Sequence, residues 1–149
     1  MELFEAVGEA LRGMVPAELG TVQFRSHRYG IKVWFGAAEP PRQHYEAQVV
    51  GAKHVPEATV LAIEVGFHAE HRKLEENDAA VARLLAGEKG WRKTLGPEPV
   101  AGPFLGRADV WRRVSETWPD PDLGDEDIAL ELAARLVDYV SAFEPLLQD

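Results

Sequence analysis

Four segments in the first half of this 149-residue chain alternate apolar and polar side chains, and this pattern constrains the fold more than any other feature. The segments are residues 22–25, 31–35, 44–48 and 59–67. Successive side chains of a β-strand point to opposite faces of its sheet, so each segment presents one apolar and one polar face. Connections rich in Gly and Pro separate the segments, and the short one at residues 26–30 is typical of a hairpin. The pattern therefore predicts neighbouring antiparallel strands.

Helical periodicity occupies most of the remaining chain. Apolar residues recur at helical spacing near the amino terminus, across residues 70–86, around residues 91–95 and across residues 125–144, where Pro145 should end the last, acidic helix. Residues 100–105 indicate another strand. Residues 109–118 fit either a strand or a helix, and Gly106 between two short apolar runs favours the strand. Residues 1–149 are thus expected to form a single α+β domain, with a mainly antiparallel, twisted sheet of five or six strands and helices packed on one face.

Composition narrows the possible functions. The chain contains no cysteine, which excludes disulfides, thiol nucleophiles and cysteine metal ligands. Its amino terminus is acidic and its longest aliphatic run is short, so we expect a soluble, cytoplasmic protein without a membrane span. The net charge of -9 arises from residues 116–149, which carry ten acids and one base, whereas residues 1–115 carry 15 bases and 15 acids. Because most of the chain is neutral, the net charge does not exclude a nucleic-acid partner.

The polar face of the predicted sheet carries an unusual set of side chains. It would show Arg25, His27, Lys32, Trp34, His44, Glu46, Gln48, Glu64 and His68. Imidazole nitrogens and carboxylate oxygens suit Zn, Mn or Fe, and side chains two residues apart on a strand project the same way. His44, Glu46, Glu64 and His68 are therefore candidate metal ligands. Their spacing matches no established metal motif, and cross-strand surface pairs between glutamates and basic residues explain the same pattern.

Trp34 is the candidate for ligand binding. It is out of phase with the apolar residues of its segment, so it should point to the polar face between Arg25 and Lys32. There it could stack on a base or another ring, or pack under the loop that contains Pro40 and Pro41. The leading hypothesis is a non-catalytic interaction or ligand-binding domain that uses Arg25, Lys32 and Trp34 and needs no cofactor. Its partner would be a protein, a small molecule or a nucleic acid, and a homodimer is compatible with this reading.

The second hypothesis is a metal-dependent hydrolase or nuclease with a site on the same face. The predicted order of helix, strands, helix and strand is roughly that of the restriction-endonuclease core. In such an enzyme carboxylates hold a divalent metal that activates water, and Glu9, Glu46 and Glu64 would supply them. The usual Glu-x-Lys step is missing from the strands, which leaves Lys32 as the available substitute. A divalent metal is the cofactor that this hypothesis requires.

The second half of the chain resembles a known family in the order of its aromatic and glycine residues. The order runs from Asn77 with Leu84 and Leu85, through residues 91–96 and 111–114, to Phe143, Glu144 and Pro145. It is similar to an uncharacterised domain often found at the carboxy end of restriction-modification and other DNA-defence proteins. The resemblance covers residues 70–147, contains no catalytic motif and assigns no site residue. It implies a role beside nucleic acid.

Overall fold

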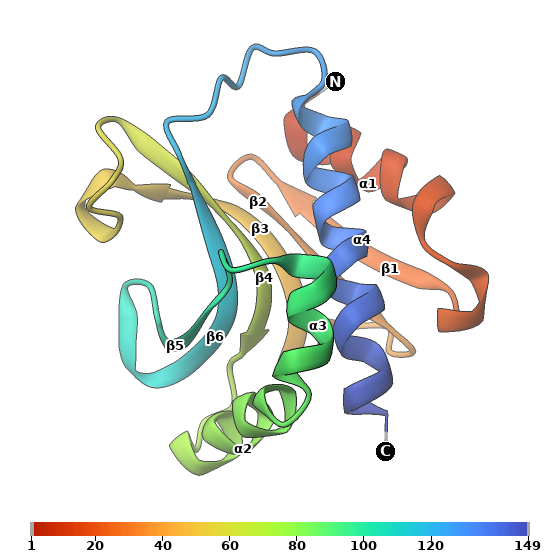
Figure 1. Ribbon diagram of the computed structural model, residues 1–149. Coiled ribbons are helices and arrows are strands. Elements are labelled where there is room, and N and C mark those ends of the chain that lie inside the picture. The colour runs from red at the N-terminus through yellow and green to blue at the C-terminus, as the bar shows by residue number, and fades with distance from the viewer. Residues whose placement is uncertain (1, 149) are drawn as a thin grey trace.

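The protein is described by a computed structural model that covers residues 2–148 and has an α+β fold. These residues form one antiparallel six-stranded sheet in the order β1-β2-β3-β4-β6-β5 (Figure 1). The strands are β1 (Val22–His27), β2 (Gly30–Phe35), β3 (Gln43–Gly51), β4 (Leu61–Ala69), β5 (Val100–Phe104) and β6 (Arg107–Pro119). The predicted fold class is confirmed, and so is the strand at residues 109–118, which belongs to β6.

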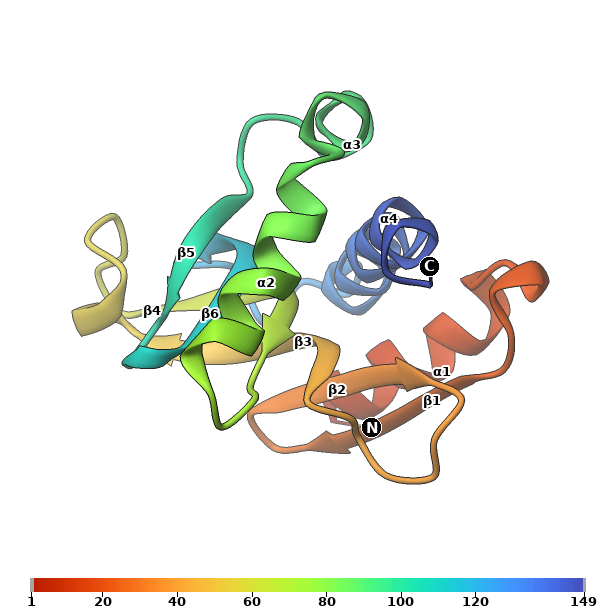
Figure 2. The same ribbon diagram turned by 90° about the horizontal axis from the view of Figure 1, so that it is seen from below.

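Four α-helices accompany the sheet in the described residues. They are α1 (Leu3–Met14), α2 (Leu74–Leu85), α3 (Glu88–Leu95) and α4 (Ile128–Leu147), and two short 3-10 turns lie at Ala17–Leu19 and Ala52–His54. Helices α1, α3 and α4 lie on one side of the sheet (Figures 1 and 2). None of the helices within residues 2–148 has the length and apolar character needed to cross a membrane.

Two predicted helix ends are wrong. Helix α2 begins at Leu74 and not at residue 70, because β4 and the extended backbone after it continue to that point. Helix α4 passes through Pro145 to Leu147, although its predicted end was residue 144. Proline cannot donate to the carbonyl four residues earlier, which here belongs to exposed Ser141. Water can reach that carbonyl, so Pro145 is tolerated in the last turns of the helix.

The main core lies between the sheet and its helices, as the alternation predicted. Ile31, Val33, Ile63, Val65 and Phe67 are all fully buried on this side of the sheet. Helix α4 covers them with Leu132, Leu136, Val140 and Phe143, and α1 adds Phe4, Val7 and Leu11. The ring of Phe67 meets that of Phe143 edge to face, with ring centroids 6.1 Å apart. This core fixes which face of β3 and β4 points away from the helices.

The face opposite the helices is not the solvated surface that the alternation predicted. The sheet curls, and its β5-β6 edge carries Phe104 onto the ring of His68, with ring centroids 4.5 Å apart. The loop after β2 covers another part, where the buried Trp34 donates its indole N–H to the Ala37 carbonyl over 2.7 Å. Polar side chains of β3 and β4 are therefore buried between the sheet and these covers.

Candidate functional site

Two histidines and two glutamates meet at the centre of this covered face. His44 and Glu46 belong to β3, His68 belongs to β4, and Glu70 follows β4 directly. The antiparallel register places His44 opposite His68, so the two His-x-Glu pairs are related by the local twofold symmetry of the strand pair. The backbone N–H of Glu70 donates to the Arg42 carbonyl over 2.8 Å, which extends the pairing to that residue. All four side chains are buried.

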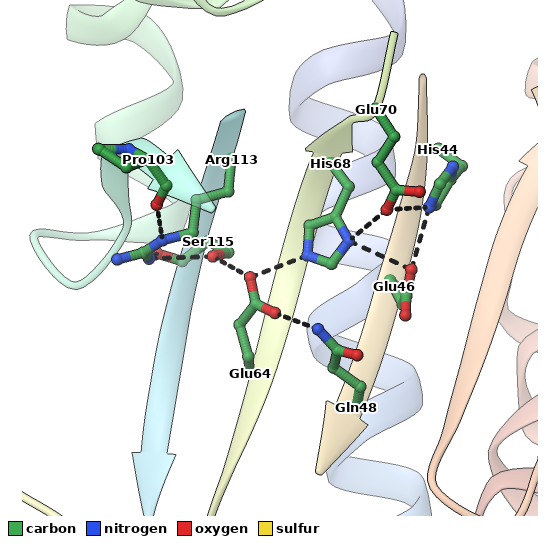
Figure 3. A network of polar contacts seen from close by, with 9 residues as sticks. All are labelled: His44, Glu46, Gln48, Glu64, His68, Glu70, Pro103, Arg113 and Ser115. Atoms are coloured by element: carbon green, nitrogen blue, oxygen red, sulfur yellow. Dashed lines mark hydrogen bonds and ion pairs between the residues drawn. The ribbon is translucent and has the colours of Figure 1, made fainter. Parts of the chain in front are cut away.

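Four atoms of these residues form a closed ring of alternating nitrogen and oxygen (Figure 3). His44 Nε2 lies 3.0 Å from Glu46 Oε1 and 3.3 Å from Glu70 Oε2. His68 Nδ1 lies 3.2 Å and 3.4 Å from the same two oxygens. Ligand atoms that surround Zn²⁺ tetrahedrally at about 2.0–2.1 Å are about 3.3 Å from one another. The four nitrogen-to-oxygen distances of the ring match this spacing, and all four atoms lie within 4.8 Å of one another.

The other nitrogen of each imidazole is already bound to an acceptor. His44 Nδ1 lies 2.9 Å from the Pro41 carbonyl, which can only accept, so Nδ1 carries a hydrogen. His68 Nε2 lies 2.8 Å from the carboxylate of Glu64 and donates to it. If the imidazole is neutral, its inner nitrogen then points a lone pair at the two carboxylate oxygens, and the lone pair and the oxygens repel each other. This repulsion is removed by a second proton on each histidine or by a cation bound among the four atoms.

Glu64 lies beside this ring and not in it, which corrects its predicted place among the metal ligands. Its Oε2 accepts from His68 and from the Ser115 hydroxyl at 2.6 Å, and its Oε1 accepts from Gln48 at 2.8 Å (Figure 3). Arg113 in turn donates to Ser115 Oγ over 3.1 Å. Histidine ligands of metals commonly donate their second nitrogen to a carboxylate or a backbone carbonyl, which fixes the tautomer. Glu64 and the Pro41 carbonyl occupy those two positions.

Gly66 allows β6 to come close enough for this outer layer. It lies in β4 between Glu64 and His68 with a φ of 153°. A Cβ atom there would be 2.5 Å from the Val114 carbonyl oxygen and 2.6 Å from the Ser115 Cα. Any other residue would push β6 away and move the Ser115 hydroxyl from Glu64. Glycine at this position thus connects the strand packing to the orientation of His68.

The charges of the cluster strongly affect one another. Burial alone would raise the pKa of Glu46, but hydrogen bonds and charges of His44 and His68 outweigh it and lower that pKa to about 2. The pKa of Glu70 is lowered even further for the same reasons. Burial alone would lower the pKa of His68, yet the charge of Glu64 and the hydrogen bonds of Glu46, Glu64 and Glu70 raise it well above its usual value. The lowered carboxylate pKa values and the raised histidine pKa values thus have the same origin, the attraction between ionised glutamates and protonated histidines.

A pocket of about 450 Å³ opens beside the ring, and both ring carboxylates line it. Lys32 lies on its β2 side with its ammonium 4.0 Å from Glu70 Oε1. Phe104, Leu105, Arg107 and Trp111 of the β5-β6 hairpin form the opposite wall. The cluster is therefore buried but connected to solvent through a pocket that a small ligand can enter.

The three predicted ligand-binding residues lie on the neighbouring strands β1 and β2, where Arg25 is opposite Lys32, but they differ in exposure and contacts. Lys32 lies at this pocket. Arg25 is exposed on the edge strand β1, where it pairs with Glu39 over 2.6 Å. Trp34 is 3% exposed, so the prediction of an open stacking surface is wrong, and its alternative of packing under the loop after β2 holds. A role of Arg25 in ligand binding stays a prediction.

Sequence reasoning missed Glu70 and the hairpin residues at the pocket. Glu70 had a local signal, because His68 and Glu70 repeat the spacing of His44 and Glu46 at the end of a strand that finishes two residues later than predicted. Arg107 and Trp111 had none, since only the curl of the sheet brings the β5-β6 hairpin to the same pocket as the polar face of β3. Comparison of the chain with protein families, curated proteins and solved structures gives no match. The resemblance to a DNA-defence domain therefore stays a prediction.

Proposed function

We propose that this protein binds a divalent transition metal through His44, Glu46 and His68, with Glu70 beside it, and uses the metal to activate water for hydrolysis. One observation carries the proposal. Both imidazoles have their outer nitrogen fixed by an acceptor, and their inner nitrogens meet two ionised carboxylates at 3.0–3.4 Å. A divalent cation at that point accepts the lone pairs of both nitrogens and neutralises both carboxylates.

The ligand set favours zinc, and manganese or iron after it. Imidazole nitrogen is a good ligand for Zn and Fe, and carboxylate oxygen is a good ligand for Mn. Mg²⁺ and Ca²⁺ prefer sites in which all ligands are oxygen atoms. The order of stability for divalent metals places Zn²⁺ above Mn²⁺ at such a site. Structural zinc sites are usually closed and rich in cysteine, whereas catalytic sites have three protein ligands and an open position. The chain has no cysteine, and this site adjoins a pocket.

Glu70 differs from the other three residues in a way that favours catalysis. Its oxygen is the most distant from both histidines, and its side chain is 11% exposed where that of Glu46 is 6% exposed. It also lies past the end of β4, at the border of the pocket. A divalent metal held there would supply a water of lowered pKa. Glu70 would hold the proton that this water loses as it attacks the substrate and would return it to the leaving group, which balances the step.

Metal binding is tested by calorimetry on chelator-treated protein, titrated separately with Zn²⁺, Mn²⁺ and Mg²⁺. We expect one Zn²⁺ per chain with at least micromolar affinity, weaker Mn²⁺ binding and no Mg²⁺ binding. The double variant His44→Ala, His68→Ala should lose the binding. His27→Ala is the matched control, because His27 is an exposed histidine of β1 outside the cluster. Equal Zn²⁺ binding by the double variant, folded by circular dichroism, would contradict the site.

Catalysis is tested with p-nitrophenyl acetate and p-nitrophenyl phosphate on the Zn²⁺-loaded protein. Glu70→Gln should keep Zn²⁺ affinity within about tenfold and lower kcat by about a hundredfold or more, as expected for loss of a general base. Glu46→Gln should instead weaken Zn²⁺ binding itself, because it removes a ligand. Equal rates for the wild type and Glu70→Gln would exclude the assigned role of Glu70.

Metal-dependent ligand binding without catalysis is the second candidate. Phe104 favours it, because its ring packs on His68 and shields one side of the metal position from water. Zn²⁺ binding with no turnover of either ester above free Zn²⁺ would select this candidate. The metal would then hold a ligand in the pocket instead of cleaving it.

A further inference from the structure

Basic residues gather around Glu70 on both sides. The pocket described above contains Lys32 and Arg107, and a second hollow of about 280 Å³ on the other side contains Arg42, Arg72 and again Arg107. The two hollows share Glu70, Arg107 and Trp111. These cations come from β2, β6 and the segments before β3 and after β4, so the fold and not one basic stretch assembles them.

These cations lack the carboxylate partners that other arginines of the chain have. Arg92 pairs with Glu88, Arg112 with Asp78 and Arg135 with Glu116, each within 3.0 Å. Within residues 2–148, no carboxylate forms an ion pair with Arg42, Arg72 or Arg107. Lys32 reaches a carboxylate only at 4.0 Å. The first hollow also contains Glu46 and Glu70, and the second contains Glu70 and Asp109. An anion therefore meets arginines without ion-pair partners once a bound metal neutralises the two ring carboxylates.

Arg107 is also held in position. Its guanidinium lies over the Trp111 ring, 4.2 Å from the ring centroid, and Trp111 packs edge to face on Phe104 with centroids 5.3 Å apart. Phe104 in turn contacts His68. These ring contacts connect the exposed guanidinium of Arg107 through Trp111 and Phe104 to His68. Guanidinium groups offer a planar pair of donors that matches phosphate oxygens, and they do so best when held in place.

We propose that the metal centre binds a small organic phosphate, with the phosphoryl group between the metal, Lys32 and Arg107 and the organic part against Leu105 and Trp111. This inference rests on the proposed metal site and names its substrate class. The pocket has the volume expected of a small-ligand site. Phosphate is favoured over carboxylate because its additional oxygens can contact the metal and two cations at once.

The test measures binding of phenylphosphonate, a non-hydrolysable probe, to the Zn²⁺-loaded protein by calorimetry. We expect Lys32→Ala and Arg107→Ala each to lower its affinity about tenfold, which corresponds to loss of one charge-assisted hydrogen bond. Both variants should keep Zn²⁺ affinity within about threefold of the wild type, because neither residue is a metal ligand. Arg28→Ala is the matched control, since Arg28 also lies over an aromatic ring, that of Tyr29, in the β1-β2 turn. It should leave both affinities unchanged.

The outcomes separate this inference from the metal site. Zn²⁺ binding without phenylphosphonate binding overturns the substrate class and leaves the metal site intact, whereas absent Zn²⁺ binding overturns the metal site itself. Equal affinity of the zinc-free protein for phenylphosphonate overturns the role of the metal. Benzoate binding as tightly as phenylphosphonate overturns the preference for phosphate. If inorganic phosphate binds as tightly as phenylphosphonate, the proposed recognition of the organic part is wrong. If a single-stranded oligonucleotide binds much more tightly than phenylphosphonate, the assignment to a small molecule is wrong.

Discussion

Two clusters of buried carboxylates lie on opposite faces of the same sheet, and they are neutralised differently. On the helix side, Glu116 of β6 accepts from Arg135 at 2.9 Å, from Tyr139 at 2.7 Å and from Trp118 at 2.8 Å. Arginine is always charged, so this cluster contains its own permanent cation. On the other face, the ring oxygens of Glu46 and Glu70 meet histidines, which are neutral unless they take up a proton, and Lys32 adds a permanent cation 4.0 Å from Glu70 Oε1.

The difference separates a structural cluster from an exchangeable one. Arg135 also donates to the Leu95 carbonyl, so it joins α3, α4 and β6. In the ring formed by His44, Glu46, His68 and Glu70, by contrast, protons on the histidines or the proposed metal can neutralise the carboxylates. The first cluster therefore contributes to folding under all ordinary conditions, whereas the second depends on what the solution supplies.

The largest expected effect comes from breaking the structural cluster. Arg135→Met should lower the free energy of unfolding by about 3–5 kcal/mol, because it leaves the carboxylate of Glu116 buried without its cation. Urea denaturation measures it. The double variant Arg135→Met, Glu116→Gln should recover part of the loss, since the orphan charge is gone. A loss below about 1 kcal/mol would show that Glu116 does not depend on Arg135.

The exchangeable cluster should respond to metal by a comparable amount. At a free Zn²⁺ concentration of 100 times Kd, the wild type should gain about 2.7 kcal/mol in unfolding free energy. Arg135→Met should gain the same increment, because its defect lies on the other face. His68→Asn should gain almost nothing. If Arg135→Met lost the Zn²⁺ increment while it remained folded, the two clusters would be coupled and the comparison would fail.

pH gives the next effect in size, because one imidazole changes the free energy of unfolding by at most about 1.4 kcal/mol per pH unit. Without metal, the raised pKa of His44 and His68 means that the folded state binds their protons more tightly. Stability from this source is complete below about pH 6.5 and is lost as the pH rises through the folded pKa values. Zn²⁺ affinity should rise over the same range, because binding displaces these protons. Thermal melts at several pH values, with and without Zn²⁺, measure both trends. If stability without metal and stabilisation by Zn²⁺ changed with pH in the same direction, protons and metal would not compete for the histidines.

The smallest effect should come from one hydrogen bond of the structural cluster. Tyr139→Phe removes the hydroxyl that donates to Glu116 and should cost about 1 kcal/mol, since Arg135 and Trp118 still satisfy the carboxylate. The change should be the same with and without Zn²⁺ in urea denaturation. A Zn²⁺-dependent difference would place Tyr139 in contact with the other cluster across the sheet.

Local patterns predicted the strands and three of the four residues in the buried His/Glu cluster. The alternation around residues 44–48 and 63–68 identified His44, Glu46 and His68 and placed them on one face, as the structure has them. It also predicted the antiparallel order, because β1 to β4 are joined by short connections. Glu70 was assigned to a helix because the residues after His68 do not alternate between apolar and polar. Glu64 was predicted to be a metal ligand because it lies on the same face of its strand as His68.

Burial of the polar face had no local signal. It results from the curl that brings Phe104 onto His68 and from the loop that covers Trp34, and both are contacts between residues far apart or without regular structure. An alternating strand looks the same whether its polar side meets water or a second layer. For that reason the sequence suggested a solvated surface where the structure has a buried charge network.

The contact between Phe104 and His68 has a kinetic consequence for a bound metal. All four proposed residues belong to the β3-β4 hairpin or the residue after it, whereas Phe104 comes from β5, an edge strand that pairs with β6 alone. Metal exchange past Phe104 would require β5 to separate, whereas exchange through the pocket beside Glu46 and Glu70 would not. Shortening Phe104 to alanine would then open a second route, so it should speed metal release more than it weakens equilibrium affinity.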